Sequence, residues 1–192
     1  MKTATAQIVG VSPIGFSKHH EEPKLDKERP ADYEKRTWRS KCHTDDDGGV
    51  FIPPMAFKNC IAECAKYLSV QIPGKGKATY TKHFEAGVLV TDPVPLGINI
   101  NDVKSINVFV PSDGKRGGGK RVWKTFPVIH KWAAKVIFYI LDETITQDVF
   151  RQHLVEAGKF IGVGWFRPRN NGYYGRFEVK DIKWEETGRD VT

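Results

Sequence analysis

The chain has 192 residues, enough for one domain, or one domain with insertions, to bury a hydrophobic core. Thirty Lys and Arg against 23 Asp and Glu give a formal net charge of +7 and a pI near 9.3, which favours a polyanionic partner. No apolar run approaches the ~20 residues that cross a bilayer, and the N-terminus lacks the features of a secretory signal. We therefore expect a cytoplasmic protein with no membrane partner.

The first part of the chain is typical of a strand, an insertion and a helix. Residues 3–11 alternate and contain β-branched side chains, which predicts a strand. Residues 17–49 are charged and interrupted by prolines, so we interpret them as an insertion, with a short strand over 33–43. Consecutive prolines then precede apolar residues at helical spacing, which predicts the first helix over 54–68.

The middle of the chain is expected to form two strands and a flexible segment. A basic loop with two glycines covers 72–82. Strands are predicted over 84–92 and 103–111. Residues 112–124 combine glycine with basic side chains, so we expect them to be too flexible and too charged to pack in the core.

The last part predicts a strand, a helix and a strand. Residues 132–141 are strongly apolar and indicate a strand. A helix should begin after Thr146, its N-cap, and end at Gly158. Alternation over 174–184 predicts the final strand.

This order of elements predicts an α+β fold. Without its insertions the chain is compatible with a ferredoxin-like, RRM-like βαββαβ core, in which two helices cover one face of an antiparallel sheet. We expect one domain over 1–192, with basic insertions at about 17–49 and 111–125.

A glycine-rich segment, 157–184, holds the first group of candidate binding residues. Glycine tolerates left-handed backbone and close approach of a ligand, and arginines and aromatic rings lie between Gly162 and Gly175. This mixture suits phosphates and unstacked bases. The alternative is a glycine-rich β-hairpin with solvated arginines. The candidates are Arg167, Arg169, Asn170, Asn171, Tyr173, Tyr174 and Arg176.

Two other basic stretches also contain tryptophan. The first comprises Lys115, Arg116, Lys120, Arg121, Trp123 and Lys124. The second comprises Arg36, Trp38, Arg39 and Lys41, of which the first three should project from the expected strand over 33–43. Both are candidate nucleic-acid contacts, and for each a solvated surface is the alternative. The other aromatic residues are expected in the core or at a subunit interface: Phe126, Trp132, Phe138 and Tyr139.

The sequence does not indicate a metal, a cofactor or a catalytic centre. Cys60 and Cys64 share a helix face and Cys42 precedes a histidine, but buried core cysteines explain this pattern better than zinc ligands. The best acid–base pair is His43 with the acidic turn 45–47, for which helix capping and solubility are the simpler explanation. His153 should be a surface or packing residue.

Three stretches of the sequence together resemble the RAMP superfamily of CRISPR-associated proteins. GGVFIPPMAFKNCIAECAKYL is similar to the family's segment that runs from a strand into the first helix, where Lys58 occupies the position of a basic residue. TQDVFRQHLVEAGKFIGVGWFRPRNNGYYGRFEV is similar to its second helix, glycine-rich loop and final strand. A basic insertion stands where such subunits carry a thumb-like hairpin. The chain departs from the family in being short, in its bulkier loop and in lacking a full finger domain.

The resemblance implies a CRISPR RNA-binding backbone subunit of a class 1 effector complex. The first hypothesis is non-catalytic binding of single-stranded RNA, or of DNA, with head-to-tail self-association and contacts to other effector-complex subunits. The second is a RAMP-type endoribonuclease. The third is a viral or mobile-element relative that binds another protein.

Overall fold

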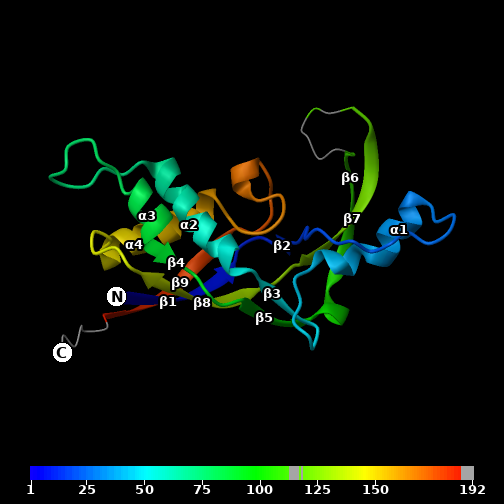
Figure 1. Cartoon of the computed structure of the whole chain (residues 1–192), viewed down its shortest axis with the longest axis horizontal. Helices are drawn as coiled ribbons and strands as arrows, with labels where there is room; N and C mark the ends of the chain where they lie inside the picture. The colour runs from blue at the N-terminus through cyan, green and yellow to red at the C-terminus, as the bar shows by residue number, and fades with distance from the viewer. Residues whose placement is uncertain (113–116, 118, 187–192) are drawn as a thin grey trace.

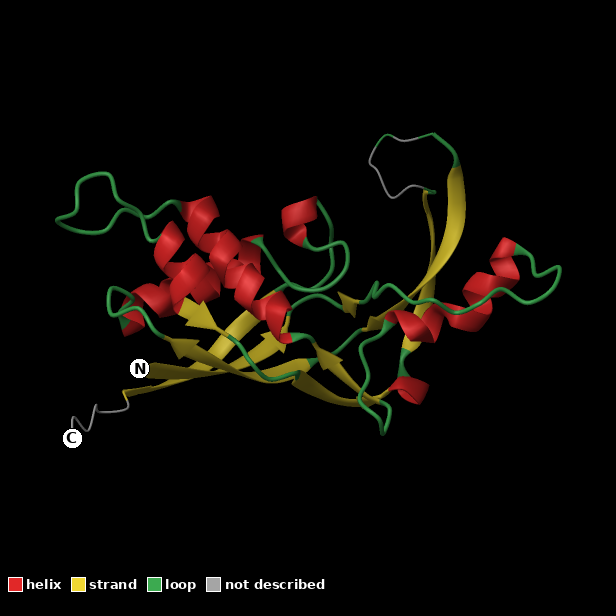
Figure 2. Ribbon diagram, viewed as in Figure 1, coloured by secondary structure: helices red, strands yellow, loops and turns green. Residues whose placement is uncertain are grey.

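A four-stranded antiparallel sheet forms the centre of the fold, with helices on one of its faces (Figures 1 and 2). The computed structural model describes residues 1–112, 117 and 119–186. The strands follow one another across the sheet in the order β4 (Val88–Leu89), β8 (Ala133–Ile140), β1 (Lys2–Gly10) and β9 (Phe177–Glu186). The two long central strands pair along their whole length, from Lys2 opposite Ile140 to Val9 opposite Ala133.

The connections between these strands confirm the predicted ferredoxin-like βαββαβ core. Helix α2 (Pro54–Leu68) lies between β1 and β4 in the chain, and α4 (Gln147–Phe160) lies between β8 and β9. A short helix, α3 (Thr81–Gly87), leads directly into β4. Figure 1 shows α2, α3 and α4 on the same side of the sheet.

The sequence of the central strand determines how closely the helices approach the sheet. Ala4 and Ala6 are fully buried on β1, and their small side chains leave room for large rings in a close-packed interior. Phe57 of α2 is one such ring, with edge contacts at centroid distances of 6.5 Å to Phe138 and 6.0 Å to Phe177. Phenylalanines from a helix and two strands thus form the centre of the core.

The remaining elements are insertions into this core. Between β1 and α2 lie β2 (Ile14–Gly15), α1 (Pro30–Thr37), the 3-10 helix η1 (Trp38–Lys41) and β3 (Gly49–Ile52). Between β4 and β8 lie β5 (Val94–Asn99), the 3-10 turn η2 (Ile100–Asp102), β6 (Lys104–Pro111) and β7 (Arg121–Ile129). A last 3-10 turn, η3 (Pro168–Asn170), follows α4.

The inserted strands form two small sheets outside the central sheet. Strands β6 and β7 are a hairpin in full register, from Lys104 opposite Val128 to Pro111 opposite Arg121, and β2 pairs with the inner end of β7. Strand β3 pairs with β5. In Figure 1 the β6–β7 hairpin rises at the end of the molecule remote from both termini.

Two strand predictions were wrong in the inserted and connecting segments. Residues 33–43 continue α1 into η1 instead of forming a strand, because Pro30 occupies the first turn of a helix, where its missing N–H is not needed. Residues 84–92 form the end of α3 and only two residues of strand, β4.

The predictions for 112–124 and for the end of the second helix also need correction. Strand β7 begins at Arg121, inside the segment expected to be a flexible loop. Helix α4 continues past Gly158 to Phe160. A Cβ atom at Gly158 would lie 2.2 Å from the carbonyl oxygen of Phe177, so this glycine allows the helix to approach β9 and does not end it.

Candidate nucleic-acid interface

The β6–β7 hairpin exposes a pair of aromatic rings beside a guanidinium group. Phe109 and Trp123 stand opposite each other in the register, with ring centroids 5.2 Å apart and exposed fractions of 43% and 63%. The Arg121 guanidinium lies 5.4 Å from the Phe109 ring centroid and donates to the Phe109 carbonyl oxygen at 2.7 Å. We call these three residues the hairpin face. Exposed rings and a cation provide stacking surfaces for bases and a donor for phosphates.

The other basic residues predicted here are placed differently. Lys120 is exposed next to the hairpin face. Lys124 is half-buried, directed to the opposite side of β7 from Trp123 by strand alternation, and its Nζ lies 3.5 Å from the Ser112 carbonyl oxygen. Lys115 and Arg116 lie outside the described residues.

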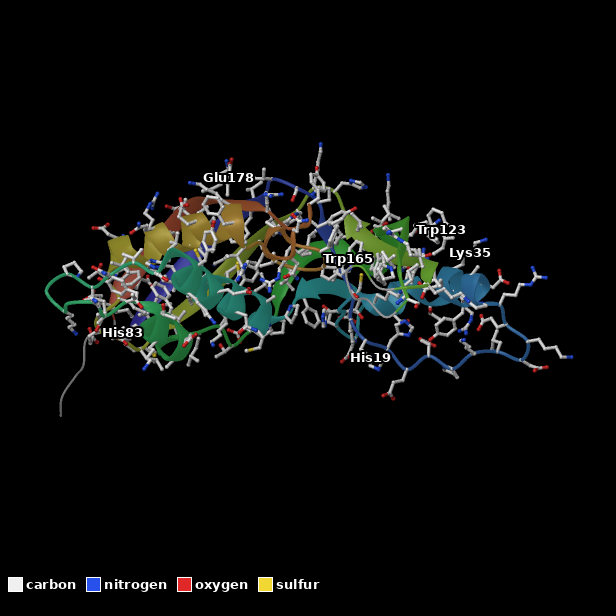
Figure 3. The ribbon with its side chains drawn as sticks, turned by 90° about the horizontal axis from the view of Figure 1, so that it is seen from above. His19, Lys35, His83, Trp123, Trp165 and Glu178 are labelled. Atoms are coloured by element: carbon white, nitrogen blue, oxygen red, sulfur yellow. The ribbon has the colours of Figure 1, made fainter. Side chains whose placement is uncertain are left out.

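A stack of aromatic rings joins the hairpin to the glycine-rich loop that follows α4, residues 161–176. Phe126 of β7 and Trp165 of the loop are nearly parallel, 15° apart, with centroids separated by 4.0 Å. Tyr174 continues the stack at 5.3 Å from Trp165, and the Lys41 ammonium lies 4.7 Å from the Phe126 centroid. Figure 3 shows Trp165 between the helical part and the hairpin.

Trp165 was not among the predicted site residues, although an aromatic residue between two glycines of the loop was a usable signal. Its position changes the interpretation of the two tyrosines. Tyr174 is half-buried in the stack, whereas Tyr173 is 57% exposed and remains available to a ligand.

The loop glycines allow the loop to pack on itself. Gly175 has φ +75°, and a Cβ atom there would lie 1.7 Å from the Val163 carbonyl oxygen. A Cβ atom at Gly172 would lie 1.7 Å from the Phe166 carbonyl oxygen. The expectation that bare loop backbone faces a ligand is therefore corrected at these positions, because protein backbone occupies the space.

The arginines of the loop divide into paired and outward-facing groups. Arg167 donates to the Glu63 carboxylate on α2 at 2.7 Å and is half-buried, so it anchors the loop to the helix. Arg169 is more exposed and stands 3.7 Å from the same carboxylate. The Arg176 guanidinium donates to the Tyr173 carbonyl oxygen at 3.4 Å, on the exposed side of the loop.

Three further candidates lie in this loop and on α2. Asn170 and Asn171 are exposed at η3, and Asn171 adopts the left-handed conformation that ends the turn, with φ +59°. Lys58 is half-buried in the second turn of α2.

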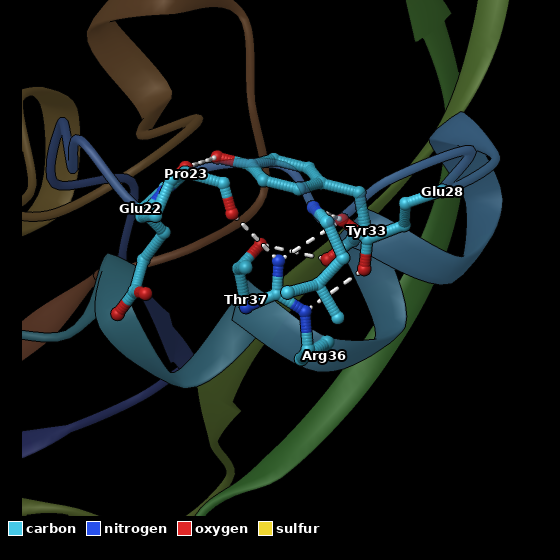
Figure 4. Close-up of polar contacts among 7 residues, drawn as sticks. Glu22, Pro23, Glu28, Tyr33, Arg36 and Thr37 are labelled. Atoms are coloured by element: carbon cyan, nitrogen blue, oxygen red, sulfur yellow. Dashed lines mark hydrogen bonds and ion pairs between the residues drawn. The ribbon is translucent and has the colours of Figure 1, made fainter.

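The candidates from the first insertion serve mainly to hold that insertion together. Figure 4 shows the Arg36 guanidinium bonded to both Glu28 carboxylate oxygens, at 2.8 and 2.9 Å, and to the Pro23 carbonyl oxygen at 2.8 Å. This hydrogen bonding lowers the pKa of Glu28 to about 2. The expected strand was wrong, because Arg36 lies on α1 and Trp38 on η1. Arg36 is exposed, whereas Trp38 is buried and does not project as expected.

Lys41 is also buried, with its ammonium bonded to Glu34 at 2.5 Å and to the Thr125 carbonyl oxygen at 2.8 Å. It therefore connects η1 to β7 and does not face solvent, contrary to expectation. Arg39 is exposed, as is Arg36, and its guanidinium lies 4.2 Å from the Trp38 ring centroid.

The Asp45 carboxylate in the acidic turn beside His43 accepts hydrogen bonds from backbone amides of the same turn. Asp45 accepts hydrogen bonds from the Gly49 amide at 2.7 Å and the Asp47 amide at 3.1 Å. The His43 ring instead contacts Phe51, at a centroid distance of 5.8 Å. In the described residues, no hydrogen bond or ion pair joins the His43 side chain to this turn, so the geometry does not assemble an acid–base pair there.

The cysteines and His153 are core residues. All three cysteines are buried, and burial raises the pKa of the Cys42 and Cys64 thiols to about 12. His153 is fully buried and stacks on Phe84 at 4.4 Å; burial lowers its pKa. No three metal-ligating side chains of the described residues cluster together.

Of the aromatic residues expected in the core or at a subunit interface, Trp132 and Phe138 lie in the core. Phe126 is buried in the stack between the hairpin and the loop, and Tyr139 is half-buried. Among the described residues, the helices are too short or too polar to span a membrane.

Solved structures share this fold, although sequence comparison finds no relatives. No protein-family model matches the chain, and no curated protein matches it significantly. A chain in the cryo-EM structure of the Type III-B Cmr-beta bound to cognate target RNA aligns with 95% of this chain, at a TM-score of 0.57 and 13% identity. The aligned part is 60% of that longer chain.

The crystal structure of Cmr6 from Pyrococcus furiosus aligns with 93% of this chain and 99% of its own, at a TM-score of 0.48 and 14% identity. The Cmr-beta likeness confirms the predicted RAMP resemblance at the level of the fold. The chain and the aligned chain of Cmr-beta thus share an α+β architecture.

The first prediction tests the pairing of the Arg36 guanidinium with the Glu28 carboxylate. Replacing Arg36 with Gln should return the pKa of Glu28 from about 2 toward 4.5, because the guanidinium hydrogen bonds stabilise the carboxylate. Since the folded-state pKa is depressed, the stabilisation is present above the unfolded pKa and is lost as the pH falls toward 2. Carboxyl NMR titration measures this change. Arg29→Gln is the control, and an unchanged Glu28 titration in Arg36→Gln would contradict the pairing.

The second prediction separates steric from conformational requirements for glycine. Gly175→Ala should lower the free energy of unfolding by about 3 kcal/mol, since the methyl group meets backbone and the left-handed conformation is strained. Gly74 has the same φ of +75° with nothing within 4 Å, so Gly74→Ala should cost only about 1 kcal/mol. Urea denaturation compares the two variants. Equal destabilisation would mean that the loop is not closed on itself at Gly175.

Proposed function

We propose that this chain binds single-stranded RNA through the hairpin face and the outward side of the glycine-rich loop, and that it does not cleave the strand. The exposed Phe109–Trp123 pair beside Arg121 is the observation that carries this proposal. Large rings exposed together on a monomer are a feature of interaction sites. Base stacking on such rings tolerates any sequence, and the cation favours a polyanion over an apolar partner.

The rest of the binding surface lies on the loop that is joined to the hairpin by the aromatic stack. Tyr173 and Arg169 are exposed on this loop, and the half-buried Arg176 makes a solvent-exposed hydrogen bond to the Tyr173 carbonyl oxygen. The formal charge of +7 adds a general attraction for phosphates. Both groups of residues therefore suit one strand that runs from the hairpin to the loop.

The assembly we propose follows from the fold and from the structure that shares it. The Cmr-beta structure contains bound target RNA, and we infer for this chain a role as a repeating, non-catalytic backbone subunit on CRISPR RNA. In this role it associates head-to-tail with its own copies and with other effector-complex subunits. We further propose that residues 1–192 act as one domain, with the hairpin in the place of a thumb.

The third prediction tests the hairpin face directly. The double variant Arg121→Ala, Trp123→Ala should bind labelled single-stranded RNA about tenfold more weakly, because a stacked base contributes about 1–3 kcal/mol. The slope of log affinity against log salt should also become shallower by about 0.7 for each phosphate that the variant no longer neutralises. Fluorescence anisotropy across a salt series measures both quantities.

The matched control removes the same kinds of side chain elsewhere. Lys180→Ala, Phe160→Ala deletes one basic residue on β9 and one ring of α4 that is 45% exposed. It should leave the affinity unchanged. Equal weakening by both double variants would remove the hairpin face from the proposed interface.

The fourth prediction concerns cleavage. A labelled strand should be recovered at full length after long incubation with the protein, because the Asp45 carboxylate is bonded to its own turn. Denaturing electrophoresis shows the result. Cleavage that disappears in His43→Ala would replace our proposal with the endoribonuclease hypothesis.

A further inference from the structure

A cavity of about 220 Å³ lies where β2 and the residues that follow it, the end of β3, the start of α2 and the glycine-rich loop meet. It is open on one side, and its walls come from separate stretches of the chain. The lining residues are Ile14, Gly15, Phe16, Ser17, Lys18, His43, Ile52, Pro53, Ala56, Gly164 and Trp165.

The size and the apolar walls of the cavity suit a planar ring. An apolar cavity of about 150 Å³ accommodates benzene, so 220 Å³ is sufficient for a larger heterocycle. Phe16 and Ile52 are buried behind the surface, while Ala56 is half-buried at the wall. A ring that enters here exchanges water for aliphatic and aromatic contacts.

The polar groups of the cavity stand at its mouth. Ser17 and Lys18 are exposed, and His43 is half-buried. Burial and the neighbouring Lys18 charge lower the pKa of His43, so at neutral pH its ring carries one donor and one acceptor nitrogen. A few polar groups around an apolar hollow are what orient a heterocycle with its own donors and acceptors.

The cavity lies between the two parts of the proposed RNA interface. Ile14 and Gly15 belong to β2, which pairs with the base of β7 at Ile129 and Val128. Next to Gly15 in the lining, Trp165 belongs to the glycine-rich loop, and its amide donates to the Gly15 carbonyl oxygen at 2.8 Å. The cavity is therefore lined both by β2, which is paired with the hairpin strand β7, and by the glycine-rich loop.

We propose that the cavity receives one unstacked base of the bound strand, with His43 and Lys18 at its polar edge. This proposal rests on the proposed function, since it requires that the chain bind a single strand. It assigns a base-binding role to residues that do not belong to the hairpin face. It also gives His43 a binding role in place of a catalytic one.

The test uses a variant whose larger side chain fills the cavity. It compares the affinity for a strand that carries bases with the affinity for a strand that has only the sugar-phosphate backbone. Ala56→Leu adds three carbon atoms to the wall, and Ala86→Leu makes the same change at an exposed position of α3. Each variant is titrated with a uridine oligonucleotide and with an abasic strand of the same length. Ala56→Leu should weaken binding of the uridine strand about fivefold or more, with abasic binding unchanged, and Ala86→Leu should change neither.

A second variant covers the case in which Ala56→Leu fails to fold. His43→Phe keeps a ring of similar shape and removes both nitrogen atoms, so it should also weaken binding of the uridine strand selectively. Equal weakening on both strands, or unchanged binding in both cavity variants, would overturn the base-binding cavity while leaving the proposed function intact. If the wild-type protein binds neither strand, the proposed function fails, and the cavity proposal fails with it.

Discussion

Phe126, Trp165 and Tyr174 stack in sequence, with centroid separations of 4.0 and 5.3 Å, and this stack sets the position of the hairpin relative to the helical core. Phe126 belongs to β7, whereas the other two rings belong to the loop that connects α4 to β9. Lys41 adds a cation at 4.7 Å from Phe126 and a hydrogen bond to the carbonyl oxygen of the preceding residue, Thr125. Large aromatic rings dominate the energetics of such junctions. The stack therefore fixes the position of the exposed hairpin rings relative to the exposed side of the loop.

The core could be predicted because its strands and helices have one buried face. The alternation in β1, with Ala4, Ala6 and Ile8 buried, is visible in the sequence, as is the helical spacing in α2. Strand β7 lacked this signal. Its outer part, from Arg121 to Lys124, has no fully buried residue. The composition of this stretch was therefore that of a flexible loop, and no strand was predicted there.

The sequence indicated which residues could bind nucleic acid, but it did not indicate which of them would be exposed together on one surface. Whether an arginine is free depends on partners that are distant in the sequence: Arg167 is bonded to Glu63, 104 positions away. Lys41 is buried because Thr125, 84 positions away, accepts its hydrogen bond. The exposure of Trp123 follows from the projection of the hairpin away from the core, a tertiary feature that local composition does not encode.

Amide hydrogen exchange with and without a single-stranded RNA oligonucleotide tests the central claim most directly, because it reports which backbone becomes protected without any mutation. We predict slower exchange in β6, in β7 and in the glycine-rich loop, with the C-terminal half of α4 unchanged. Protection confined to β9 or to the lysine-containing turn between α2 and α3, with the hairpin unchanged, would contradict the proposed interface.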